Sequence, residues 1–138
     1  MISKTRILSI SRDPVLVSFL ERGLNGDEYE VFNTQLEGAY LKDVIDSEKP
    51  DFVVLDIIMP SLDGIGICLQ LRQWTQVPIM MLSTWGADSG TVKGLSLGSE
   101  DYLSEPFGPK VLKKRIAETL KRKAAVSNPL HNSRTVNN

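Results

Sequence analysis

Five short apolar segments, separated by stretches of helical periodicity, are the feature that most constrains the fold of this chain. The segments cover residues 6–10, 29–32, 52–55, 79–82 and 102–104. Between them, apolar residues recur three or four positions apart, which is the period of a helix that buries one side. An alternation of strands and helices predicts an α/β fold in which parallel strands are joined by right-handed crossovers.

The composition of the strands predicts where the helices pack. Residues 52–55 and 79–82 are apolar at every position, which is typical of strands covered by helices on both faces of a sheet. We therefore expect a doubly wound, five-stranded parallel sheet flanked by five helices. The fourth helix is expected around residues 92–97. The last is expected to begin at Pro109 and to bury Val111, Leu112, Ile116, Ala117 and Leu120.

The length and composition indicate one domain of a cytoplasmic protein. A chain of 138 residues can bury a single core. A net charge of −1 argues against a dominant surface for nucleic acid or membrane, and we expect no membrane partner. The single cysteine, Cys68, excludes an internal disulfide and is typical of a reducing compartment. No apolar run reaches the length of a membrane span or a signal peptide.

The chain divides into a folded part and a polar end. We expect residues 1–126 to form the domain, whereas residues 127–138 are polar, lack an apolar period and contain Pro129. This composition predicts a linker or a disordered tail. Such a tail can lead to a DNA-binding domain outside this chain, and we expect any DNA contact to be made there.

Candidate functional residues follow the apolar segments. In open parallel sheets, sites lie beyond the carboxyl ends of the strands. The residues at these ends are Ser11, Arg12, Asp13, Asp56, Ser83, Thr84, Ser104 and Glu105. Asp56 stands out because it directly ends an apolar strand, where a carboxylate is held rigidly enough to act as a nucleophile or metal ligand.

Three segments resemble the receiver domains of bacterial response regulators, in family order and at family spacing. They are residues 55–64, 77–83 and 94–107, and the resemblance covers residues 5 to 124. The last segment is most similar to receivers attached to winged-helix DNA-binding domains. The resemblance implies a flavodoxin-like fold and a phosphoacceptor at Asp56 that receives its phosphoryl group from a histidine kinase. It further implies switch residues at Ser83 and Tyr102.

The chain departs from the family pattern where a pair of acids would hold Mg²⁺ and a lysine would pair with the phosphoryl group. Ser11 and Arg12 align with the acids, and Glu105 aligns with the lysine. An arginine about 5 Å from a bound cation would cost several kcal/mol even at an effective dielectric constant near 20. We therefore expect little or no Mg²⁺-dependent phosphorylation of Asp56, and no cofactor. If a metal does bind, its ligands would be Asp13 and Asp56.

Two alternatives at this site stay open. Arg12 can pair with Asp56, with Glu105 or with both, and so replace the metal by an internal cation; otherwise the changes are independent drift. If the alignment of the first strand is shifted by one residue, Asp13 joins the acid pair and a weak metal site returns.

The resemblance also implies a homodimer through the last two helices, with Asp101, Lys113 and Arg115 on the contact face. The favoured function is an atypical receiver in two-component signal transduction. It would regulate transcription through dimer or partner contacts and would not be an enzyme. The alternative is a working phospho-receiver that accepts phosphate on Asp56 and uses Mg²⁺. An unrelated α/β enzyme ranks last because the sequence has no nucleophile–base pair or glycine-rich phosphate loop.

Overall fold

The computed structural model describes residues 4–26, 28–35, 39–56, 63–83, 101–104 and 108–126. Its strands are β1 (Thr5–Ile10), β2 (Tyr29–Thr34), β3 (Phe52–Asp56), β4 (Ile79–Ser83) and β5 (Asp101–Ser104). Its helices are α1 (Pro14–Leu24), α2 (Ala39–Glu48), α3 (Asp63–Trp74) and α5 (Pro109–Val126). All neighbouring strands pair in parallel, in the order β2-β1-β3-β4-β5.

The predicted fold class is confirmed. The strand order is that of the flavodoxin-like doubly wound sheet, in which the chain winds first to one side of β1 and then to the other. The helix predicted around residues 92–97 and the polar end at residues 127–138 lie outside the described residues. None of the helices in the described ranges combines the length and the apolar composition that a membrane span requires.

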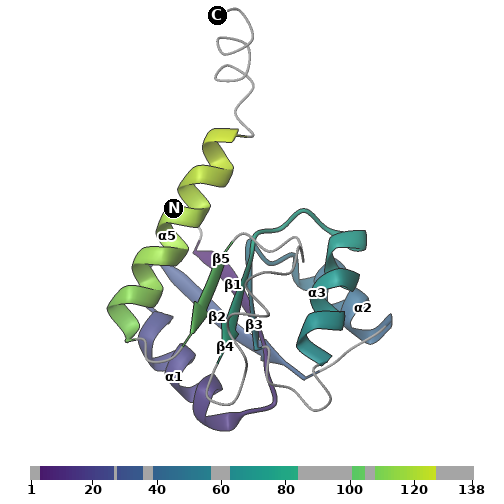
Figure 1. Ribbon diagram of the computed structural model, residues 1–138, viewed down its shortest axis with the longest axis horizontal. Coiled ribbons are helices and arrows are strands. Elements are labelled where there is room, and N and C mark those ends of the chain that lie inside the picture. Colours follow the sequence, from purple (N-terminus) through teal and green to yellow (C-terminus); the bar gives the residue numbers. More distant parts are fainter. Residues whose placement is uncertain are drawn as a thin grey trace, which may run out of the picture.

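Helices cover the sheet on both sides, with α1 and α5 on one face and α2 and α3 on the other (Figure 1). Side chains of alternating strand residues fill the two layers. On β1, Ile7 packs with α1 and α5, whereas Leu8 and Ile10 pack with α2 and α3. On β3, Phe52 and Val54 join the first layer, and Val53 and Leu55 join the second. This period of two places every second residue on a given face. Cys68 is buried in the second layer.

Two residues predicted to face inward from α5 are exposed. Val111 retains 46% of its surface, and Ala117 is also exposed. The buried side of α5 instead passes through Leu112, Ile116 and Thr119. The prediction was wrong because helical spacing is compatible with more than one buried side of the helix. The prediction chose the side with the most apolar residues, whereas the buried side includes a threonine.

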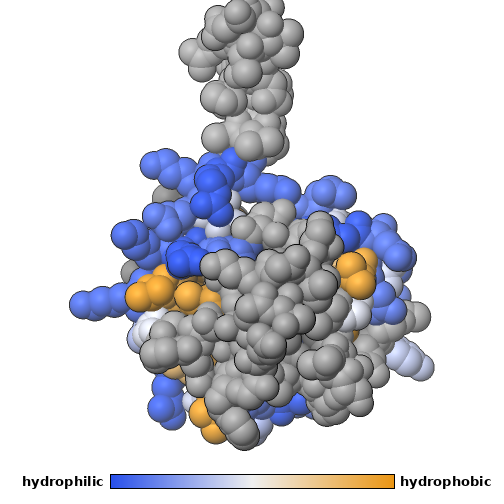
Figure 2. Space-filling view, viewed as in Figure 1, coloured by the Kyte–Doolittle hydropathy of each residue, from blue (hydrophilic) through white to orange (hydrophobic). Residues whose placement is uncertain are grey.

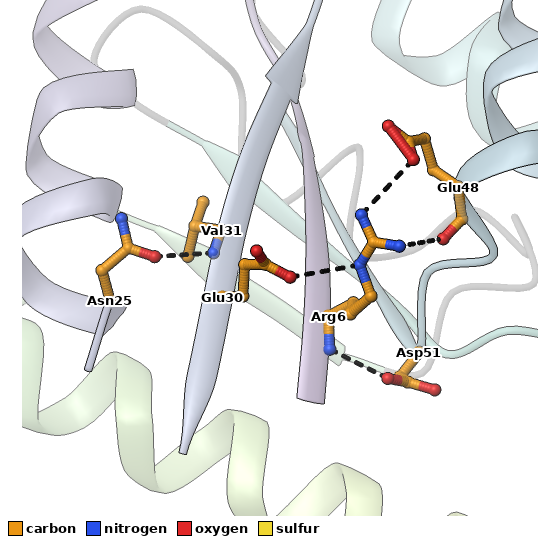
Figure 3. Close-up of polar contacts among 6 residues, drawn as sticks. All are labelled: Arg6, Asn25, Glu30, Val31, Glu48 and Asp51. Atoms are coloured by element: carbon orange, nitrogen blue, oxygen red, sulfur yellow. Dashed lines mark hydrogen bonds and ion pairs between the residues drawn. The ribbon is translucent and has the colours of Figure 1, made fainter. Parts of the chain in front are cut away.

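Arg6 ties together the end of the sheet at which the strands begin (Figure 3). Its side chain donates to the Glu48 carbonyl at 2.8 Å and forms ion pairs with Glu30 and Glu48 at 3.3 and 3.4 Å. Its backbone N–H donates to Asp51 Oδ2 at 2.8 Å. The guanidinium also lies 4.7 Å from the centroid of the Phe32 ring. These contacts join β1, β2 and the α2–β3 connection, and they leave the opposite end of the sheet for the candidate site.

Candidate functional site

The register of the sheet brings the predicted strand-end residues together. Ile10 pairs with Leu55 and Asp56 pairs with Leu82, so the chain leaves β1, β3 and β4 at neighbouring points of one edge. Ser83 pairs with Ser104 at the end of the next pair of strands. The structure therefore gathers Ser11, Asp56 and the backbone of Ser83 at the carboxyl edge of the sheet, where parallel folds place their sites.

A buried hydrogen bond between Ser11 and Asp56 is the centre of this edge. Each residue is only 1% exposed, and Ser11 Oγ donates to Asp56 Oδ2 at 3.0 Å. The same hydroxyl accepts a hydrogen bond from the backbone N–H of Asp13, also at 3.0 Å. A serine hydroxyl has one proton to donate and can accept in addition, so both capacities of Ser11 are used. The contact offsets part of the desolvation of a carboxylate taken out of water.

Asp13 begins α1. It stands just before the helix in an extended backbone conformation, and its Oδ1 accepts from the backbone N–H of Val15 at 2.9 Å. Pro14 occupies the first turn, where its missing N–H costs nothing. This is the geometry of a helix N-cap. One carboxylate oxygen of Asp13 is thus engaged by the helix.

Two residues that sequence reasoning missed hold the backbone of Ser11 through hydrogen bonds. Asn33 on β2 donates through Nδ2 to the Ser11 carbonyl at 3.3 Å. Ser9 on β1 donates through Oγ to Asn33 Oδ1 at 2.9 Å. Ser9 is 1% exposed, and a polar residue between Leu8 and Ile10 in an apolar strand was the signal that pointed to a buried partner. The hydrogen bonds therefore run from β2 through β1 to β3.

The remaining predicted pocket residues are only partly described. Arg12 follows Ser11 and its side chain is exposed. Glu105 lies outside the described residues, and the side chains of Ser83 and Tyr102 do as well. The pairing of Arg12 with Asp56 or Glu105 stays a prediction, as do the switch roles of Ser83 and Tyr102.

The residues predicted for a dimer face lie on β5 and α5. Arg115 Nε donates to Asp101 Oδ2 at 2.7 Å, and its NH2 group donates to Oδ1 at 2.8 Å. This fork-shaped contact raises the pKa of Arg115 above its usual value, chiefly through the hydrogen bond to Asp101. Lys113 is exposed. Two of the three predicted contact residues therefore pair with each other inside one chain.

Comparisons with known proteins agree with this architecture. Residues 7–117 match the response regulator receiver domain family. The chain is 39% identical to the "Probable transcriptional regulator ycf27" of Porphyridium aerugineum, over 97% of this chain and 56% of the relative. It is 36% identical to the alkaline phosphatase synthesis transcriptional regulatory protein PhoP of Bacillus subtilis, over 92% of this chain and 54% of the relative. The chain thus spans about half the length of the curated relatives it matches.

Solved structures show the same likeness. The BeF3-activated N-terminal receiver domain of RstA from Klebsiella pneumoniae superposes with a TM-score of 0.71 at 31% identity. The match covers 83% of this chain and 97% of that one.

Proposed function

Because the chain belongs to the response regulator receiver domain family, we propose that it is the receiver module of a transcription regulator that works with little or no Mg²⁺-dependent phosphorylation. The module would act through contacts with a second copy of the chain or with a partner protein. The observation that carries this proposal is the hydrogen bond of 3.0 Å from Ser11 to Asp56, at the position where the family has a metal-binding acid. The relatives named as transcriptional regulators support the transcriptional role.

The donor set at this edge does not fit Mg²⁺. The ion requires nearly octahedral oxygen ligands at about 2.0–2.1 Å and is usually held by one or two carboxylates. Asp56 Oδ2 accepts a hydrogen bond from the Ser11 hydroxyl, and Asp13 Oδ1 accepts one from the backbone N–H of Val15 in the first turn of α1. A cation bound to these two oxygens would compete with both hydrogen bonds, and the positive charge of Arg12 stands between Ser11 and Asp13 in the sequence. We therefore infer that the module has no resident metal or other cofactor.

The same arrangement opposes phosphoryl transfer to Asp56. Transfer depends on positioning and on neutralising the charge of the phosphoryl oxygens. Ser11 is uncharged, and Glu105, at the place of the family's lysine, would repel those oxygens. Arg12 supplies a positive charge that can pair internally with Asp56 or Glu105. Asp56 then serves mainly as an acceptor that holds β1 against β3, and the module is not an enzyme.

Partner contacts would use the β5 and α5 side. Lys113 is exposed there. The side chains of Arg115 and Asp101 are 39% and 17% exposed, so their ion pair within the chain could be replaced by ion pairs with a second molecule. A homodimer through this face fits the family. A histidine kinase remains a partner of the alternative function, in which Asp56 is phosphorylated. We place the protein in the cytoplasm, in keeping with its single, buried cysteine, which excludes an internal disulfide.

Intact-mass measurement after incubation with acetyl phosphate and Mg²⁺ tests the proposal. We expect no phosphoryl adduct on the wild type, and no Mg²⁺-dependent heat on titration with beryllofluoride. The matched variant is Ser11→Asp with Arg12→Asp, which restores the acid pair and should gain measurable Mg²⁺ binding. Asp56→Asn controls for modification elsewhere.

An adduct on the wild type that Asp56→Asn abolishes would establish the alternative, a working phospho-receiver with an unusual metal shell. If the wild type stays unmodified but the double variant also fails to bind Mg²⁺, Ser11 and Arg12 are not what disables the pocket. The assignment of that role to these two residues would then be wrong.

A further inference from the structure

The outward side of α5 carries a row of lysines. Lys110, Lys114 and Lys121 are four and seven residues apart, so they lie on one side of the helix, with Lys113 beside them. All four are exposed, while Leu112, Ile116 and Thr119 form the buried side. Figure 2 shows hydrophilic side chains projecting from the part of the surface where Figure 1 places α5. We call these four residues the lysine stripe.

Within the described ranges, the lysine stripe lacks acidic partners. Several other cations in the described ranges do form ion pairs, such as Lys42 with Asp46 at 2.8 Å and Arg115 with Asp101 at 2.7 Å. In the part of the chain that the structure describes, no carboxylate forms an ion pair with a lysine of the stripe. Its positive charge is therefore directed at the solvent.

Charge is strongly segregated between α5 and the rest of the chain. The helix has seven basic residues and a single acidic one, Glu118. Since the whole chain has a net charge of −1, the residues outside α5 together are clearly negative. A domain with one positive pole orients that pole toward a polyanion and keeps its other surfaces away from it. The net charge of the chain, which argued against a nucleic-acid surface, does not reveal this positive region because acidic residues elsewhere balance it.

We propose that the lysine stripe binds the phosphate backbone of double-stranded DNA, an inference that rests on the proposed role in transcription regulation. Eleven residues separate Lys110 from Lys121, which corresponds to about 16 Å along a helix. A row of this length spans several phosphates. Ala117 and Ala124 lie exposed on the same side of the helix as the lysines, and their small side chains cannot read bases or insert into lipid. Glu118, the only acid of α5, is also exposed beside this side. Phosphate contact without sequence readout would add to the contacts of any DNA-binding domain outside this chain.

Apart from Lys113, which belongs to both, this stripe is distinct from the predicted dimer face. Val111, Arg115 and Arg122 are spaced by four and seven residues and form a second row on α5, next to Asp101 of β5. Substitutions at Lys110, Lys114 and Lys121 should therefore leave dimer contacts in place. The two functions can be tested separately on one helix.

The test compares two triple variants of the full chain with the same change in net charge. One replaces Lys110, Lys114 and Lys121 by Gln. The control replaces Lys4, Lys42 and Lys49, which are exposed and lie outside α5, by Gln. Binding to a fluorescent 30-base-pair duplex of random sequence is followed by anisotropy between 50 and 200 mM KCl, and binding to vesicles of anionic phospholipid is measured alongside.

Counterion release sets the expected result. Four phosphate contacts give a slope of about −3.6 for log K against log[salt], so the wild type should lose roughly 150-fold in affinity over this range. The α5 variant, with one lysine left, should lose only about 3- to 4-fold and should bind weakly throughout. The control should retain a slope close to that of the wild type.

Three outcomes would overturn the inference. The first is that the wild type does not bind DNA at 50 mM KCl. The second is that the two triple variants lose equal amounts of affinity for the duplex, and the third is that the wild type binds the vesicles but not the duplex. The second outcome would show that only net charge matters. None of these results depends on phosphorylation of Asp56, so failure here and failure of the proposed function are distinguishable.

Discussion

Removal of the Ser11 hydroxyl should destabilise this domain more than removal of the neighbouring Ser9 hydroxyl. Ser11→Ala deletes the donor to the buried Asp56 carboxylate and the acceptor for the Asp13 N–H. A hydrogen bond to a charged group contributes about 1.5–3 kcal/mol, and the contact with the less buried N–H adds roughly 0.5–1 kcal/mol. The expected cost is therefore about 2–4 kcal/mol.

Ser9→Ala is the matched control. Both serines are 1% exposed; Ser9 lies on β1, and Ser11 directly follows that strand. Ser9 donates to Asn33, which is uncharged, so its loss should cost only about 0.5–1.5 kcal/mol. Chemical unfolding in urea gives both values. In thermal unfolding, each kcal/mol should lower Tm by roughly 3 °C for a chain of this length.

A double-mutant cycle of Ser11→Ala with Asp56→Ala isolates the contact from other effects of each substitution. The cycle is needed because Asp56→Ala alone also removes a buried charge and can even stabilise the domain. We expect a coupling energy of about 1.5–3 kcal/mol. A coupling energy below about 0.5 kcal/mol would refute the reasoning, because it would mean that Ser11 and Asp56 do not share a hydrogen bond in solution.

Other contacts lead to further predictions. Asp13→Ala removes the N-cap of α1 and should cost about 1 kcal/mol in urea unfolding, whereas Asp13→Ser should largely preserve stability; equal losses would contradict the capping role. Burial and the nearby Glu28 raise the pKa of Tyr29 above 10.0. The unfolded chain therefore ionises first, and stability should fall as pH rises through 10 and level off above the pKa of the folded state. Tyr29→Phe should lose less stability over the same pH range, and an identical profile would rule out this cause. Arg115→Met should cost at most about 1 kcal/mol, because the pair with Asp101 is partly exposed, and the cost should shrink in 1 M NaCl if charge is responsible.

The sequence alone determined the architecture because its signals are local. Apolar runs of four residues separated by helical periods specify strand, helix and parallel winding without any knowledge of contacts. Asp56 could be placed at the carboxyl edge for the same reason, since it directly ends the β3 segment. The family resemblance then identified which strand ends matter.

Only the tertiary structure decided how the site residues are joined. Ser11 and Asp56 are 45 residues apart, and their hydrogen bond depends on the register between β1 and β3. The support from Asn33 depends in turn on the register with β2. On α5, Thr119 is buried and Val111 is exposed because the helix is rotated by its packing against the sheet. Helical spacing defines the width of the buried arc, whereas the partners across the interface choose which residues fall within it.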